Sequence, residues 1–370
     1  MGNQQSQHNN SGHAHHGKKQ LDPRIVSAFN SLSNGKDTIG LEQIKPSIGA
    51  KLALSIWPSL QDTQQRITLE QFVERAETIL NFTPDIAVRM LMPAQKLVTA
   101  CLEADGIEVQ TEEEKAFLNS LVEHMESNAK TADALVDWKN TNCARMCHPL
   151  VERVQSLLTA IPFKQGPKIH SAILNDVQMF ILRHALPTTV FFPDPSRHSS
   201  DEDWLLLYSS ARDGMSTTRF EAKVFDYKGP SVLILRQSSN DIYAIATDEE
   251  WRHTSKAFGG PYSVLFQFSP QFVRLQFPPP AISCNFKARS SPLGLSYGNR
   301  LLIEEAMANV GGMEVWGCAG AETLREQSKT KQRHAQQAER NAKVPLPGKW
   351  EEEKAILEMA GHRFSSERRD

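Results

Sequence analysis

The residues best suited to covalent chemistry form one short motif. Gly294-Leu295-Ser296-Tyr297-Gly298 has the G-x-S-x-G pattern in which α/β-hydrolases present a nucleophilic serine. Such a serine requires a buried strand before it, and an acid and a histidine after it. Residues 287–292 are too polar for a buried strand, and the later histidines, His334 and His362, lie in a polar tail. We therefore expect a protein that is not an enzyme, with a serine hydrolase at Ser296 as an alternative.

Residue types that bind metal ions occur in two places, but their spacing does not fit a metal site. Cys143, Cys147 and His148 form a Cys-x-x-x-Cys-His run, whereas zinc requires four ligands and no second pair of ligands follows at a suitable distance. The histidines near the N-terminus are irregularly spaced. We expect no metal site and no cofactor. The odd total of five cysteines indicates free thiols in a reducing compartment.

An internal repeat predicts a pair of EF-hand-like units. Residues 38–44 (TIGLEQI) recur as residues 66–72 (RITLEQF), and each copy places an isoleucine at the eighth position of an EF-hand loop. The two isoleucines, Ile39 and Ile67, should pair in a short two-stranded contact. Calcium requires carboxylates at loop positions 1, 3 and 5 and a glutamate at position 12. Asp62 is the one acidic residue at these eight positions. We expect structural loops, and a calcium-responsive sensor remains an alternative.

The periodicity of apolar residues changes at about residue 165. Residues 21–164 are mostly helical by pattern, and Thr111 and Glu114 form a capping box before one of the helices. After a helix at residues 173–184, β-rich runs alternate with turn residues, which favours an antiparallel β-sandwich. The predicted strands cover residues 204–208, 231–235, 242–246, 264–268 and 272–277.

Several linked motifs occur in order along this β-rich part. Residues 203–216 (DWLLLYSSARDGMS) are followed by residues 229–233 (GPSVL), 265–270 (LFQFSP) and 313–317 (MEVWG). In these motifs residues 165–320 resemble a TLDc domain, which implies an antiparallel sandwich flanked by helices. The glycines of the G-x-S-x-G motif would then form a tight turn. Within the family, the chain is most similar to the lysosomal mTOR-associated (eak-7) type, which also begins with Met-Gly-Asn and carries a degenerate EF-hand-like region.

Both ends of the chain carry features of attachment. Met1-Gly2-Asn3-Gln4-Gln5-Ser6 matches the pattern for N-myristoylation of Gly2, and residues 1–20 are polar enough to form a disordered tether. Residues 321–348 are predicted to form a charged linker, and within it residues 322–343 are either a solvated linker or an exposed helix. Residues 349–370 are predicted to form an amphipathic helix that binds a partner through Trp350, Ile356, Leu357 and Phe364.

Composition and resemblance together predict an α+β adaptor with a helical region at residues 21–164. The net charge of -2 gives no reason to expect a nucleic-acid partner, and no apolar run is long enough to span a bilayer. The resemblance implies the V-ATPase and mTOR signalling components as partners, with resistance to oxidative stress as an outcome. We expect a cytoplasmic protein that is peripheral on lysosomal or vacuolar membranes, held there by its N-terminal acyl chain.

Overall fold

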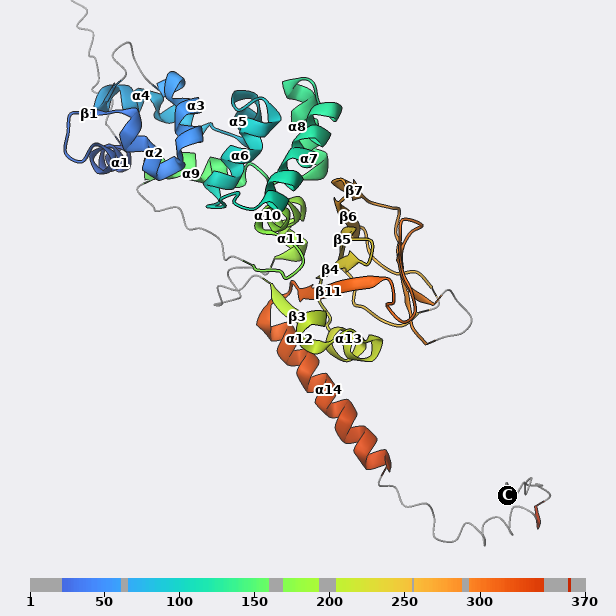
Figure 1. The fold of residues 1–370 in the computed structure, drawn as a ribbon. Coiled ribbons are helices and arrows are strands. Elements are labelled where there is room, and N and C mark those ends of the chain that lie inside the picture. The colour runs from blue at the N-terminus through green and yellow to red at the C-terminus, as the bar shows by residue number, and fades with distance from the viewer. Residues whose placement is uncertain are drawn as a thin grey trace, which may run out of the picture. The chain divides into compact units, whose positions relative to one another are not determined.

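The computed structural model describes residues 22–60, 66–159, 169–192, 204–254, 256–287, 293–342 and 359–360. The chain divides into two compact units. Unit 1 consists of Met1–Pro187 with Asn240–Tyr243 and Phe266–Leu275, and unit 2 consists of Thr188–Ser239, Ala244–Leu265 and Gln276–Asp370. Helices precede an antiparallel sheet region along the chain, so the predicted α+β class is confirmed (Figure 1).

The helices of unit 1 begin where the sequence supplies caps. Asp22 accepts a hydrogen bond from the Arg24 amide at 2.9 Å, and Pro23 occupies the first helical position. The predicted capping box forms, since Thr111 and Glu114 exchange hydrogen bonds of 2.9 and 3.2 Å. The helices are α1 Pro23–Ser33, α2 Leu41–Ile48, α3 Ala50–Leu60, α4 Leu69–Leu80, α5 Pro84–Met90, α6 Ala94–Ala104, α7 Glu112–Asn128, α8 Ala132–Asn142, α9 His148–Thr159 and α10 Asp176–Ala185.

The repeat in the N-terminal half forms the predicted paired contact. Strands β1 (Thr38–Ile39) and β2 (Ile67–Thr68) run antiparallel, and Ile39 lies opposite Ile67. Both isoleucine side chains are fully buried. The β1 strand follows α1 and precedes α2, and β2 lies between α3 and α4, so each copy has the helix–loop–helix order of an EF-hand.

The strands after residue 204 form two sheets. The larger sheet has the order β3-β11-β4-β5-β6-β7, which places the last strand of the chain, β11, between β3 and β4. β11 is antiparallel to both, and Glu314 lies opposite Ser209 on one side and Ile234 on the other. The strands are β3 Leu205–Ser209, β4 Ser231–Gln237, β5 Ile242–Thr247, β6 Val264–Ser269, β7 Val273–Leu275 and β11 Val310–Gly317. All six match strands or motifs predicted from the sequence.

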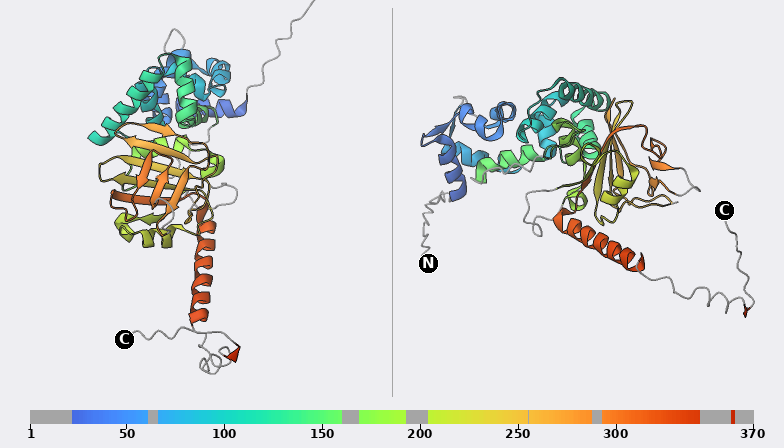
Figure 2. Two further views of the ribbon diagram at one scale, coloured as in Figure 1. Left: turned by 90° about the vertical axis from the view of Figure 1, so that its right-hand side faces the viewer. Right: turned by 60° about the horizontal axis from the view of Figure 1, so that its bottom comes forward.

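The smaller sheet was not predicted. Its order is β10-β9-β8, formed by β8 Ile282–Asn285, β9 Gly294–Tyr297 and β10 Leu301–Ile303. The Tyr297 side chain on β9 is fully buried, and its hydroxyl donates a 3.0 Å hydrogen bond to the Ser263 carbonyl, just before β6. This bond ties the small sheet to a segment of the same unit. Figure 2 shows the strands from two further sides.

Unit 2 also contains α11 Thr188–Phe191, α12 Ser210–Asp213, α13 Thr217–Val224 and α14 Gly320–Ala342. α14 runs away from the strands in the views of Figures 1 and 2. In residues 322–343, for which the sequence left a solvated linker and an exposed helix open, the structure has a helix as far as Ala342. The predicted helix at 349–370 lies outside the described residues apart from Met359 and Ala360, as does Gly2. Among the described helices, none combines the length and apolarity that a bilayer span requires.

Candidate partner-binding surface

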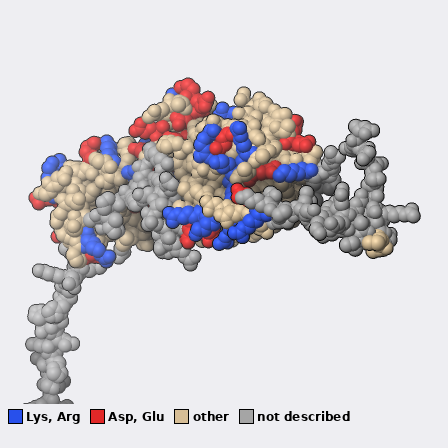
Figure 3. All heavy atoms as spheres, turned by 90° about the horizontal axis from the view of Figure 1, so that it is seen from below, with Lys and Arg blue, Asp and Glu red and all other residues tan. Residues whose placement is uncertain are grey.

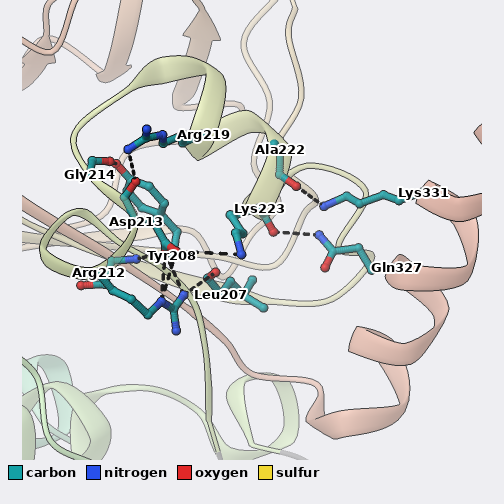
Figure 4. Close-up of polar contacts among 11 residues, drawn as sticks. Leu207, Tyr208, Arg212, Asp213, Gly214, Arg219, Ala222, Lys223, Gln327 and Lys331 are labelled. Carbon is teal, nitrogen blue, oxygen red and sulfur yellow. Dashed lines mark hydrogen bonds and ion pairs between the residues drawn. The ribbon is translucent and has the colours of Figure 1, made fainter. Parts of the chain in front are cut away.

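The DWLLLYSSARDGMS segment builds the turn between β3 and α13. The Asp213 carboxylate accepts hydrogen bonds from the Ser209 amide at 3.0 Å and from Arg212 Nη2 at 2.8 Å. Arg219 Nη1 donates to the main-chain carbonyl of Asp213 at 2.6 Å (Figure 4). The hydrogen bond from Arg212 lowers the pKa of Asp213. These charged side chains therefore stabilise a turn and one another.

Two further contacts fix the same turn in place. The Tyr208 hydroxyl donates a 2.9 Å hydrogen bond to the carbonyl of Gly214. Gly214 has a φ of +81°, a left-handed conformation that glycine adopts without strain and that other residues disfavour. The Ser210 hydroxyl accepts a 2.9 Å hydrogen bond from the Met313 amide on β11. The opening motif is thus bonded directly to the closing strand.

The first half of α14 is attached to the C-terminal end of α13. Gln327 is buried, and its Nε2 donates to the carbonyls of Lys223 at 2.9 Å and Phe225 at 2.7 Å. Lys331 Nζ donates to the carbonyl of Ala222 at 2.5 Å (Figure 4). The last carbonyls of a helix have no partner within the helix, and cationic side chains are favoured there by the helix dipole. α14 therefore caps α13.

The start of α14 is fixed by a buried tyrosine. The Tyr227 hydroxyl accepts a 2.9 Å hydrogen bond from the Ala319 amide. A Cβ on Gly317 would lie 2.6 Å from Cζ of Tyr227, and a Cβ on Gly229 would lie 3.0 Å from Cε1 of the same ring. The ring therefore fits because both neighbouring residues lack a side chain. Burial raises the pKa of Tyr227, so the phenol stays protonated.

On another side of α13, Glu221 holds two basic groups. Its carboxylate lies 3.1 Å from His253 Nε2 and also accepts a hydrogen bond from Lys287 Nζ. Burial alone would raise the pKa of Glu221, but the hydrogen bonds from Lys287 and His253 outweigh it and lower the pKa. Helix α13 is thus bonded both to α14 and to Lys287, which follows β8 in the chain. Figure 3 views the molecule from below and shows groups of Lys and Arg side chains in blue.

Ser296 lies within a strand and not at a turn between strand and helix. It is on β9, paired with Ser283 of β8 and Leu302 of β10, and its Oγ lies 2.6 Å from that of Ser283. A nucleophile elbow requires the serine to lie between a strand and a following helix. Of the two glycines that were expected to form a tight turn, only Gly298 lies in one. Gly298 is in the turn after β9, with φ +53°, whereas Gly294 begins β9, where a Cβ would lie 2.0 Å from the Ile303 carbonyl oxygen.

The glutamines at position 12 of the EF-hand-like loops cap helices. Gln43 Oε1 accepts a 2.9 Å hydrogen bond from the Gly40 amide, and Gln71 Oε1 accepts one of 3.0 Å from the Thr68 amide. In a calcium-binding loop the side chain at this position coordinates the ion. Here the side-chain oxygen instead completes the N-terminus of α2 or α4. Asp62 lies outside the described residues.

The EF-hand-like helices pack against a further helix of the same chain, α9. α9 packs against α1, α2, α4, α5 and α6. Its buried face includes Leu150, Val154, Leu157 and Leu158. Arg153 adds hydrogen bonds to the carbonyls of Ala104 and Ser47. Calcium sensors expose a groove between their helices to an amphipathic helix of a partner, and here α9 packs against these helices instead.

All five cysteines are free and buried. Cys143 and Cys147 lie in the connection between α8 and α9. Cys147 Sγ is 4.0 Å from that of Cys101 on α6, and burial raises the pKa of Cys101 and Cys143. Deprotonated thiols are the reactive form, so these are packing residues. In the described part of the chain, no group of three or more His, Cys, Asp or Glu is arranged to hold a metal ion.

Comparison with known proteins identifies the sheet-containing part. Residues 168–292 match the family model of the TLDc domain. The chain therefore contains a TLDc domain. In the structure, β11 completes the larger sheet from beyond the matched residues, because it lies between β3 and β4.

Named relatives are distant and match in part. "Restriction of telomere capping protein 5" of Neurospora crassa is 24% identical, with 42% of this chain and 41% of the relative covered. "Oxidation resistance protein 1" of Xenopus tropicalis is 23% identical, with 58% of this chain and 26% of the relative covered. The chain thus spans about two fifths or less of the length of these relatives.

The predicted partner-binding residues and the attachment of α14 lie in different parts of the chain. Trp350, Ile356, Leu357 and Phe364 are outside the described residues. Sequence reasoning missed Gln327 and Lys331, which place α14 on the domain. A signal was present, because Leu324, Gln327 and Lys331 recur three and four residues apart, the spacing of one helix face.

Proposed function

We propose that the protein is a non-enzymatic adaptor whose TLDc domain binds a partner assembly at a membrane. The match of residues 168–292 to the TLDc family carries this proposal. The polar side chains of the signature motif support a non-enzymatic role, because Tyr208, Arg212 and Asp213 form hydrogen bonds that stabilise the fold. The named relatives include an oxidation resistance protein, which supports a role in resistance to oxidative stress.

The proposed address is the lysosomal or vacuolar membrane, reached in part through an acyl chain on Gly2. One myristoyl chain gives marginal membrane affinity, of the order of 10⁴ M⁻¹, so a second attachment is required for stable anchoring. Replacing Gly2 by Ala should move the protein from the membrane to the soluble fraction of cells. Unchanged membrane association of the Gly2→Ala protein would remove the acyl tether from the proposal.

The proposed partners are the V-ATPase and mTOR signalling components, as the family resemblance implies. α14 is fixed to the domain at Gln327 and Lys331, and the segment with Trp350, Ile356, Leu357 and Phe364 follows it along the chain. Aromatic and aliphatic side chains of this kind form the anchors of protein interfaces. Deleting residues 344–370 should reduce capture of the proton pump from membrane extracts, and an undiminished yield would reject this segment as the binding element.

The alternatives from the sequence have little support in the geometry. A calcium sensor would need ligands at loop positions where Gln43 and Gln71 cap helices, and an open groove where α9 is packed. A hydrolase of this type would need Ser296 at a turn between a strand and a helix, whereas Ser296 lies within a strand that is paired on both sides. A calcium-dependent change of helix exposure that Asp62→Ala abolishes would revive the sensor, and esterase turnover lost in Ser296→Ala would revive the enzyme.

A further inference from the structure

The outward face of α14 carries a row of basic side chains. Arg325, Lys329 and Arg333 are four residues apart, and Arg340 follows seven residues later. Residues at these intervals lie on one side of an α-helix, and the row spans roughly 22 Å at the helical rise. All four side chains are exposed. We call these four residues the basic row.

The basic row faces away from the domain. Gln327 and Lys331, whose side chains bond to the carbonyls of α13, lie on the opposite side of the helix (Figure 4). No described residue forms an ion pair or hydrogen bond with Arg325, Lys329, Arg333 or Arg340 through its side chain. The attachment of α14 therefore leaves the row directed to solvent.

The charge of this helix opposes that of the whole chain. From Lys329 to Ala342 the helix carries four basic residues, Lys329, Lys331, Arg333 and Arg340, against one acidic residue, Glu339, while the chain as a whole has a net charge of -2. Glu322 and Glu326 lie on the same side of the helix as Arg325 and offset its charge, so the positive charge of the row is concentrated at Lys329, Arg333 and Arg340. A local excess of positive charge attracts anionic surfaces and ligands.

We propose that the basic row of α14 binds the surface of an anionic phospholipid membrane. Residues 329–342 contain no aromatic, leucine, isoleucine, valine or methionine side chain. Protein interfaces depend on apolar and aromatic anchors, and single-stranded nucleic acids on aromatic stacking. Attraction to an anionic lipid surface requires charge alone, at about 1 kcal/mol for each Lys or Arg near the surface. The row therefore fits lipid headgroups best.

This inference goes beyond the proposed acyl tether and is independent of it. A polybasic surface is one of the second signals that make anchoring by a single acyl chain stable. The proposed contact of the basic row depends on Arg and Lys side chains of a helix that the structure describes, whereas the tether depends on Gly2. Because the two contributions have separate residues, they can be tested separately.

The test uses the full chain without acylation, made in bacteria that lack the acylating enzyme. Sedimentation would compare vesicles of phosphatidylcholine alone with vesicles of phosphatidylcholine and phosphatidylserine in equal parts. The test variant combines Lys329→Gln, Arg333→Gln and Arg340→Gln, since glutamine has a helix propensity close to that of lysine and arginine. The matched control combines Lys51→Gln, Lys96→Gln and Lys130→Gln, which removes the same charge from exposed lysines of unit 1.

We expect the unmodified chain to bind the phosphatidylserine vesicles and to be released by salt, because screening weakens exposed charges. Each neutralised residue of the row should lower partitioning about fivefold, so the test variant should lose about a hundredfold. The control should stay within a few-fold of the unmodified chain. Equal binding of the test variant and the control to the phosphatidylserine vesicles would overturn the proposal. Tighter binding of the unmodified chain to single-stranded RNA than to the vesicles would also overturn it. The fractionation of Gly2→Ala reports on the tether whichever result is found.

Discussion

The attachment of α14 to α13 can be tested by removing the hydrogen-bond donor of one side chain. Gln327→Met keeps the length of the side chain but leaves the carbonyls of Lys223 and Phe225 without the bonds of 2.9 and 2.7 Å. Each such bond contributes about 0.5–1.5 kcal/mol net, so the loss should be about 2 kcal/mol for the pair. That free energy corresponds to about a thirtyfold increase in the opening equilibrium of the helix.

Hydrogen exchange of the amides at residues 323–331 measures this opening directly. The matched control is Gln336→Met, since Gln336 is exposed on the same helix and has the same size. We expect faster exchange in α14 of Gln327→Met and unchanged exchange in β4 and β11. If the α14 amides exchange at the same rate in the two variants, Gln327 does not hold the helix, and the capping of α13 by α14 is wrong.

Three further outcomes follow from the structure. Gln43→Ala and Gln71→Ala should each lower the free energy of unfolding of unit 1 by about 1 kcal/mol, because each removes a helix cap. Urea unfolding measures this, and an unchanged free energy would mean that the caps do not contribute. Gly317→Ala should destabilise unit 2 by about 1–3 kcal/mol, since its Cβ would lie 2.6 Å from Cζ of Tyr227, and an unshifted melting temperature would contradict this packing. Burial lowers the pKa of His184 to about 3, below its usual value of about 6.5, so stability should be full above pH ~6.5 and fall toward pH ~3 by up to ~1.4 kcal/mol per pH unit. The acid-unfolding curve of His184→Gln should lack this slope.

The elements with a strong repeating pattern were predicted from the sequence. Ile39 and Ile67 were expected to pair because they occupy equivalent positions of a repeat, and they do. The strands β3 to β7 were visible as runs of apolar residues between turn residues, and β11 was indicated by the MEVWG motif of the family resemblance. The smaller sheet was missed because β9 contains a glycine and a serine and is followed at once by a second glycine, and its strand geometry comes from pairing with β8 and β10.

The candidate surface was predicted less well, for a physical reason. Trp350, Ile356, Leu357 and Phe364 were selected because apolar side chains on an isolated helix suggest a partner. The polar residues that attach α14 bond to main-chain carbonyls more than 100 positions away, as with Gln327 and Lys223. Main-chain acceptors have no residue type, so a single sequence does not show which side chain will reach them.

The central claim is that this chain acts by binding an assembly and not by catalysis. The most direct measurement is a titration of purified V-ATPase with the full chain, compared with a chain that ends at residue 343 and with the Ser296→Ala chain. The account predicts a saturable complex with the full chain and with Ser296→Ala, and an affinity at least about tenfold weaker for the shortened chain, which is about 1.4 kcal/mol. Absence of any complex with the full chain would contradict the claim, and equal affinity of the full and shortened chains would reject residues 344–370 as the binding element.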